Sequence, residues 1–363
     1  MQHINELSSI LNQFFNWNKA RITCLAQMVR GIIAVKTVNL TQVALAFSTK
    51  ASSASSYRRI QRFFKDFDFD PSIMCALVFS LFSLEGSLTV LMDRTNWKLG
   101  KMHLNLLVIS IAYYGVSIPV FWINLNRGGS SSTDQRIFCI LKIVYKLGKS
   151  SIGCVVGDRE FIGKEWFLWL IENKIDFVFR IKSNTLVKTC SNDRFPSPAY
   201  SFFRKLKNKR KKSLKQKLWI GNLVIYLSAS RSRTGDLLVV ATPRFNRRAL
   251  KIYKIRWQIE NLFSSLKSKG FNLEDTHLTE KKKVEKLFFV LVIAFCWSYL
   301  VGVERNNKTK IPIKTHGRMS QNIIRYGYDS LRKAVLQSHV HFSRFYRFLK
   351  PHKIFEFIGD LYV

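Results

Sequence analysis

The sequence predicts an α/β protein whose mixed sheet is interrupted by a β-rich insertion and flanked by two helical regions. From Ser87 the hydrophobic pattern takes the period of strands, and three strands follow one another before the first helix of the core. Two further strands then alternate with helices. The five predicted strands are 87–92, 104–113, 116–125, 151–156 and 177–181. This order is typical of an α/β core with a mixed sheet.

Residues 1–75 precede this core and are predicted to be helical, because apolar residues recur there at spacings of three and four. The small polar stretch 48–57 leads into Arg58 and Arg59. A helix that begins with hydroxyl residues and carries basic side chains suits docking on phosphates. The alternative is a loop followed by a solvated helix face.

Residues 184–235 interrupt the core and are predicted to form the β-rich insertion. They contain the basic run Arg204–Lys212, with Lys209 and Arg210, and strand candidates at 218–220 and 223–229. Such a run is often solvated or disordered, but on a DNA-bound face it neutralises phosphates. We therefore divide the chain into a helical DNA-binding region, the first part of the core, the insertion, the second part of the core and a basic helical region. Their predicted bounds are 1–75, 86–183, 184–235, 236–305 and 306–363.

The charge of the chain predicts a polyanionic partner. Lys and Arg number 59 against 23 Asp and Glu, a formal net charge of +36. A compact protein with this charge repels itself, so nucleic acid is the first expected partner and an anionic membrane surface the second. The apolar run 287–303 is slightly short for a membrane span, and we expect a buried core helix there and no membrane.

The six cysteines are scattered and form no CxxC pair. This pattern favours reduced thiols in a cytoplasmic protein over a zinc site or a disulfide framework. The amino terminus has no basic segment followed by an apolar run, so no secretory signal is expected.

Three carboxylates stand where a metal site is expected. Asp93 and Asp158 follow predicted strands, and ligands gather at the carboxyl edge of an open α/β sheet. With Glu260 they make a set that can hold two Mg²⁺ or Mn²⁺ ions. Singly, each aspartate has another explanation: Asp93 as the ion-pair partner of a neighbouring Arg, and Asp158 as a turn residue.

Glu260 belongs to a predicted helix with an unusual polar edge. At about 100° per residue, Tyr253, Arg256, Glu260 and Lys267 share an arc of about 60°. An acid beside an aromatic and two basic residues suits a metal ion held next to a phosphate chain. The alternatives are an i,i+4 ion pair between Arg256 and Glu260 and ordinary packing of Tyr253.

The spacing Tyr253-x2-Arg256-x3-Glu260-x6-Lys267 resembles the YREK signature of DDE transposases of bacterial insertion sequences. The segments 93–97 and 157–161 resemble the two aspartate motifs of that branch. The resemblance covers roughly residues 88–303. It implies an RNase H-like core, interrupted before its last acidic helix by a β-rich insertion.

The resemblance also implies an activity: binding of terminal inverted repeats, metal-dependent cleavage and strand transfer in cut-and-paste transposition through a hairpin. Double-stranded DNA would be the partner of a homodimer, without a small-molecule cofactor, in the bacterial cytoplasm on the nucleoid. A catalytically inactive DNA-binding protein is the alternative. Asp93, Asp158 and Glu260 would be catalytic and bind the metal. The expected DNA contacts are Tyr253, Arg256, Lys267, Arg180, Lys182, Arg58, Arg59, Lys209 and Arg210.

One feature of some relatives is missing. They carry a Trp, which receives a flipped base, at the start of the strand before the signature helix, where this chain has residues 235–237 without Trp. Trp219 and Trp97 are candidate substitutes, although core packing is the expected role of each.

Overall fold

The structure, a computed structural model, describes residues 2–70, 72–82, 84, 86–99, 102–125, 128–267, 270–315, 317–337 and 343–349. Within them the chain forms two compact units. We call one the helical unit (Met1–Leu84, Asn96–Leu104 and Leu262–Val363) and the other the sheet unit (Glu85–Thr95 and Asn105–Asn261).

The core of the sheet unit is a mixed sheet. Its strands are β1 (Leu88–Leu99), β2 (Met102–Tyr113), β3 (Val116–Asn124), β4 (Ile152–Gly157), β5 (Asp176–Ile181), β8 (Lys211–Ser213), β9 (Leu218–Ile220), β10 (Leu223–Arg231) and β11 (Leu237–Thr242). In the described part of the chain they run in the order β3-β2-β1-β4-β5-β11-β10-β8, with β9 beside β10. β4 is parallel to β1 and β5, whereas β2–β3 and β5–β11 are antiparallel. The predicted α/β fold class with a mixed sheet is confirmed, and the strand order is consistent with the RNase H-like core that the resemblance implies.

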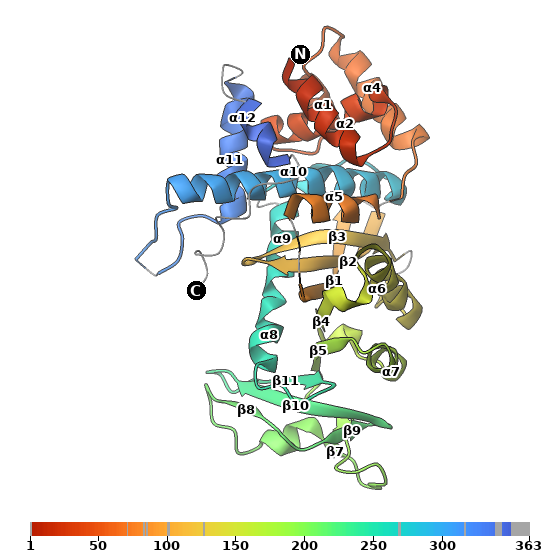
Figure 1. Cartoon of the computed structure of the whole chain (residues 1–363), viewed down its shortest axis with the longest axis vertical. Helices are drawn as coiled ribbons and strands as arrows, with labels where there is room; N and C mark the ends of the chain where they lie inside the picture. Colours follow the sequence, from red (N-terminus) through yellow and green to blue (C-terminus); the bar gives the residue numbers. More distant parts are fainter. Residues whose placement is uncertain are drawn as a thin grey trace. The chain divides into compact units, whose positions relative to one another are not determined.

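Helices cover the sheet from two sides. α6 (Thr133–Leu147) and α7 (Lys164–Glu172) lie on one side of β4 and β5, and α8 (Ala249–Ile255) lies on the other (Figure 1). α6 begins with a capping box in which Ser132 and Gln135 each bond the other's backbone. Ser132 is therefore the N-cap, and the helix begins at Thr133. A 3₁₀ turn, η2 (Arg159–Phe161), follows β4.

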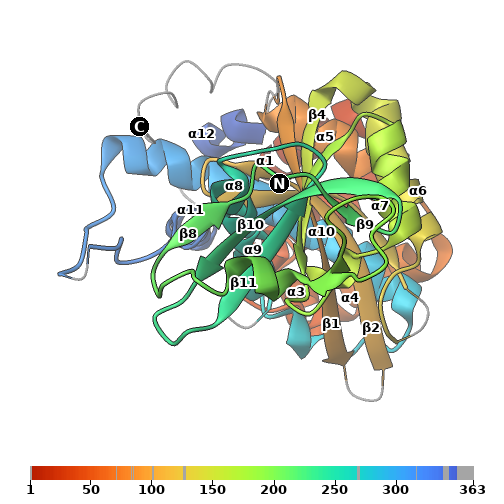
Figure 2. The same cartoon turned by 90° about the horizontal axis from the view of Figure 1, so that it is seen from below.

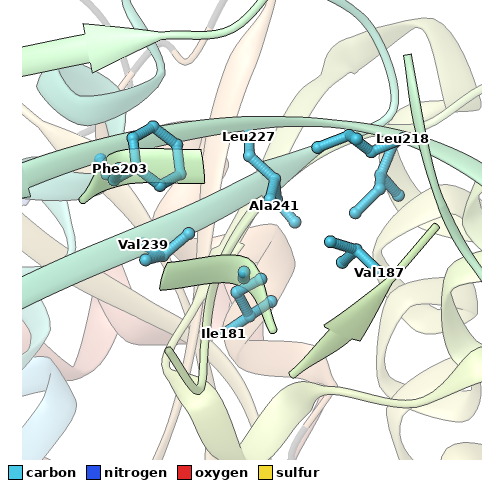
Figure 3. Packing of buried hydrophobic residues seen from close by; sticks show 10 residues of the cluster. Ile181, Val187, Phe203, Leu218, Leu227, Val239 and Ala241 are labelled. Carbon is cyan, nitrogen blue, oxygen red and sulfur yellow. The ribbon is translucent and has the colours of Figure 1, made fainter. Parts of the chain in front are cut away.

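The insertion extends the main sheet. β10 pairs antiparallel with β11, and β8 pairs with β10, so the three lie side by side (Figure 2). β8 includes the last residues of the predicted basic run. A short separate pair, β6 (Leu186–Val187) and β7 (Ser197–Pro198), completes the strands. The apolar cluster beneath them joins insertion residues such as Phe203 and Leu227 to Ile181 of β5 and Val239 of β11 (Figure 3).

The helical unit contains the predicted N-terminal helices, the predicted buried helix around 287–303 and the helices that follow it. They are α1 (Gln2–Phe14), α2 (Lys19–Val35), α3 (Leu40–Leu45), α4 (Ser53–Asp66), α5 (Ile73–Phe82), α10 (Lys281–Lys308), α11 (Ile323–Leu336) and α12 (Ser343–Tyr346). Residues 350–363 of the predicted C-terminal region lie outside the described residues. The five-part division of the chain stays a prediction about its organisation.

α10 is the described helix that is long and apolar enough to cross a membrane. Of its most apolar 18-residue stretch, 94% is buried inside the protein. Length and composition are weak evidence for a span, because the core helix of a soluble protein has the same features. Lys286 on this helix shows how its polar atoms are accommodated. Its ammonium donates to the Phe64 carbonyl at 3.0 Å and pairs with Asp68 at 2.7 Å.

Two local expectations were wrong. Asp93 does not end its strand but lies within β1, which continues to Leu99 beside β2. The predicted helix over 253–267 is interrupted at Arg256, between α8 and α9 (Trp257–Leu266). There the Arg256 N–H bonds the Tyr253 carbonyl three residues back, a tighter turn than in an α-helix.

Candidate active site

The first two carboxylates are placed side by side by strand register. β1 and β4 are parallel, and the last residues paired between them are Met92 and Gly157. Asp93 and Asp158 follow them directly, Asp93 within β1 and Asp158 just after the end of β4. Neighbouring strands lie about 4.8 Å apart, so both aspartates start from the same edge of the sheet at about that spacing. The prediction that strand geometry brings these two acids together agrees with this register.

The third carboxylate is joined to the first by one guanidinium. Arg256 Nη1 lies 3.2 Å from Asp93 Oδ2, and its Nη2 lies 2.7 Å from Glu260 Oε1. The Arg256 and Asp93 side chains are 11% and 15% exposed. Arg256 Nε is buried and has no hydrogen-bond partner among the described residues. The i,i+4 ion pair between Arg256 and Glu260, one of the alternatives from the sequence, is therefore present together with a second bond to Asp93.

The second aspartate has partners of its own. The Tyr253 hydroxyl donates to Asp158 Oδ1 at 3.2 Å, and Arg180 Nη1 lies 3.9 Å from the same oxygen. The Arg256 guanidinium also lies over the Tyr253 ring, 5.5 Å from its centroid. Tyr253 is buried and contacts both Asp158 and Arg256.

Burial and ion pairing have opposite effects on the pKa values of Asp93 and Arg256. Burial raises the pKa of Asp93 to about 6, although the Arg94 N–H bond and the Arg256 charge act to lower it. For Arg256, burial lowers the pKa, but Tyr253, Glu260 and Asp93 together outweigh it and the net pKa is raised. The guanidinium is therefore a fixed positive charge between two carboxylates.

The residues at this edge fit a divalent cation by their chemistry. Carboxylate oxygens are the donors that Mg²⁺ and Mn²⁺ take. Among the described residues, no group of three or more His, Cys, Asp or Glu is arranged to hold a metal ion. A guanidinium stands between two of the candidate ligands, Asp93 and Glu260. These two carboxylates gather around one cation, and a metal ion there would require Arg256 to leave.

Lys267, the last residue of the signature, belongs to the helical unit. Its ammonium donates to the Asn96 carbonyl at 3.5 Å and lies 5.6 Å from the Trp97 ring. Trp97 itself is 2% exposed and packs near Phe263 and Phe288, as expected for a core residue. Trp219 is part of β9 and is partly buried.

The other predicted DNA contacts occupy two places, one in each unit. In the sheet unit Arg180, Lys209 and Arg210 line a cavity of about 490 Å³, and Lys182 is exposed. In the helical unit Arg58 is exposed on α4 and lines a cavity of about 500 Å³. Arg59 differs from Arg58, because its guanidinium donates to the Ala20 carbonyl at 3.1 Å.

Two features of the site were missed from the sequence. Arg94 and Glu160, which follow the two aspartates, form a fork-shaped ion pair at 3.1–3.2 Å. Their only signal was their position inside the two aspartate motifs. Trp257, next to Arg256, is 61% exposed, and its place at the break between α8 and α9 was not predicted.

The comparisons with known proteins identify the family. A family model described as the transposase DDE domain matches residues 141–333, more than half of the chain. The chain belongs to this transposase family. None of the curated proteins matches the transposase in sequence.

Among solved structures, the transposase is similar to a piggyBac transposase synaptic complex with hairpin DNA, determined by cryo-EM. The two share 12% sequence identity at a TM-score of 0.44, over 98% of this chain and 84% of that chain.

The raised pKa of Asp93 predicts how the stability of the metal-free transposase depends on pH. An unfolded Asp has a pKa of about 3.9, so the folded protein binds more protons between there and about pH 6. The contribution of Asp93 to stability is complete below the unfolded pKa and is lost as the pH rises through about 6. Relative to Asp93→Asn, the wild-type free energy of unfolding should fall by about 2 kcal/mol from pH 4 to pH 7.

Urea unfolding of both proteins in a metal chelator measures this difference. Parallel pH profiles for the wild type and Asp93→Asn would contradict the burial of an Asp93 carboxyl with a raised pKa.

Proposed function

We propose that this transposase binds the terminal inverted repeats of an insertion sequence and catalyses metal-dependent DNA cleavage and strand transfer. One observation carries the proposal: Asp93 and Asp158 leave adjacent strands in register, and Arg256 joins Glu260 to Asp93. Two carboxylates around one positive charge, with a third beside them, are a poor device for stability in a chain with so few acids. They are well suited to a site that exchanges one cation for another.

In the proposed active state, Asp93, Asp158 and Glu260 hold two Mg²⁺ or Mn²⁺ ions. Ions bound there would activate a water or a 3′-hydroxyl and stabilise the leaving oxygen of a phosphodiester. The chain's own residues bind and orient the DNA. Arg256 exchanges its two carboxylates for phosphate oxygens, which match its planar fork. Tyr253 does the same with its hydroxyl, and Lys267 adds a point charge.

The net charge of +36 supports double-stranded DNA as the partner, both as transposon end and as target. Phosphate contacts from Arg58, Lys182, Lys209 and Arg210 belong to the same proposal, as does Arg180 once it leaves Asp158. Arg59 is also a proposed phosphate contact, but its guanidinium first has to release the Ala20 carbonyl. A homodimer in the synaptic complex, a hairpin intermediate and a cytoplasmic, nucleoid-associated location complete it.

The second candidate is a catalytically inactive protein that occupies element ends. One observation favours it: Arg256 lies between Asp93 and Glu260 and competes there with a metal ion. The two candidates differ in one measurable property, metal-dependent nicking of DNA.

The three carboxylates predict the result of alanine substitution. Asp93→Ala, Asp158→Ala and Glu260→Ala should each abolish Mg²⁺-dependent cleavage of a labelled DNA end taken from the sequence that flanks the reading frame. Binding of that end in a gel shift should remain. Asp176→Ala is the matched control, since Asp176 begins β5 and pairs with Arg244 away from the signature. Full cleavage by any of the three variants would refute the site.

The position of Arg256 predicts that its substitution has opposite effects on metal binding and on DNA binding. Arg256→Ala removes the cation between Asp93 and Glu260, so the DNA-free protein should bind Mn²⁺ more tightly, by roughly tenfold for each 1.4 kcal/mol of competition removed. It should also bind DNA more weakly, with a salt slope reduced by about 1.

Lys267→Ala is the comparison variant for this experiment, because its ammonium contacts a carbonyl and a Trp ring. It should weaken DNA binding and leave Mn²⁺ affinity unchanged. Calorimetry with Mn²⁺, and DNA binding at several salt concentrations, measure both. Mn²⁺ affinity that is unchanged or lower in Arg256→Ala would show that the guanidinium does not compete with metal.

A further inference from the structure

Strand pairing brings the two aspartates side by side, but other contacts have to position their side chains. The register between β1 and β4 ends at Met92 and Gly157, one residue before Asp93 and Asp158. Beyond that point β1 continues as a strand, whereas the chain after Gly157 turns into η2. The backbone that carries Asp158 therefore leaves the register of β1, and side-chain contacts hold it relative to Asp93.

Arg94 and Glu160 make that tie. Arg94 Nε lies 3.2 Å from both carboxylate oxygens of Glu160, and its Nη2 lies 3.1 Å from Oε2. The two side chains are 17% and 24% exposed. Arg94 also donates its backbone N–H to Asp93 Oδ1 at 2.8 Å, so the same residue orients the first aspartate directly. A bidentate arginine–carboxylate pair fixes geometry more tightly than a single contact.

Both ends of this pair are braced by the surrounding unit. Arg94 Nη1 donates to Asn105 Oδ1 at 3.2 Å, and Asn105 donates in turn to the Gly129 carbonyl. On the other side, Arg136 Nη2 donates to the Glu160 carbonyl at 3.1 Å and to the Ser131 carbonyl at 2.7 Å. The turn after β4 is thus held against β1, β2 and α6.

We propose that Arg94 and Glu160 are positioning residues that set the separation of Asp93 and Asp158 for metal binding. This inference rests on the proposed function. Stability alone is a weak reason for such a pair, because partly buried ion pairs often contribute little net stability. Residues that orient metal-binding carboxylates commonly change metal affinity or activity by 10- to 100-fold when they are altered.

The alternative is that Glu160 acts as a fourth metal ligand. Removing Arg94 distinguishes the two roles, because they predict opposite changes in Mn²⁺ affinity. If Glu160 bound the metal, removing Arg94 would free its carboxylate and strengthen Mn²⁺ binding. If the pair positions the aspartates, removing Arg94 weakens Mn²⁺ binding. Arg94 and Arg256 are then two arginines beside the same acid with opposite effects on metal affinity.

The test measures Mn²⁺ binding to the full-length, DNA-free protein by calorimetry, with Mn²⁺ alone as the probe. Arg94→Ala and Glu160→Gln should each bind Mn²⁺ about 10- to 100-fold more weakly than the wild type. In cleavage assays their kcat should fall while KM for DNA stays within about twofold. The matched control is Arg244→Ala, which breaks the Arg244–Asp176 pair of the same unit, at 2.8 Å, and should leave both properties unchanged.

Should a single variant fail to fold, the double variant Arg94→Gln with Glu160→Gln keeps a hydrogen-bonding pair without buried charge, and it should still lose Mn²⁺ affinity. Wild-type affinity in the double variant, tighter binding in Arg94→Ala, or an equal loss in Arg244→Ala would overturn the positioning role. Absence of Mn²⁺ binding and cleavage in the wild type would instead overturn the proposed function, and this inference with it.

Discussion

The bonds of the Arg256 guanidinium to Asp93 and Glu260 are the interaction on which the rest of the site depends. A carboxylate as buried as Asp93 is costly without a nearby positive charge. Arg256 supplies that charge, and by doing so it also holds Glu260 at the sheet edge and lies over Tyr253. The same contact occupies the position between the two carboxylates that the proposed metal ion would need. The contact that stabilises the metal-free site therefore competes with the proposed metal binding.

That opposition gives the site a physical order of events. A phosphate chain and a pair of carboxylates compete for one guanidinium, and DNA brings many phosphates to a protein with a charge of +36. In the proposed mechanism, a turn of Arg256 to a phosphate would leave two carboxylates without their cation and able to act as metal ligands. Metal binding and DNA binding are then coupled, and by linkage each favours the other. Arg94 and Glu160 act differently, since their pair stays closed and keeps the aspartates in place.

Much of this could be predicted from the sequence, and the rest depends on distant contacts. Periodicity predicts the strands that carry Asp93 and Asp158, and the four-residue spacing of Arg256 and Glu260 predicts their ion pair. No local pattern predicts that Arg256 also reaches Asp93, which is 163 positions away in the chain. The pairing of Arg94 with Glu160 spans 66 positions and is hidden for the same reason. β8 was missed because its lysines have no alternation, and pairing with β10 decides its conformation.

The most direct test is a crystal structure of the transposase bound to a DNA end with Mn²⁺, in which anomalous scattering locates the metal. We predict that Mn²⁺ lies among Asp93, Asp158 and Glu260 and that the Arg256 guanidinium contacts a DNA phosphate. Mn²⁺ bound away from these carboxylates, or Arg256 still bonded to Asp93 and Glu260 beside the metal, would contradict it.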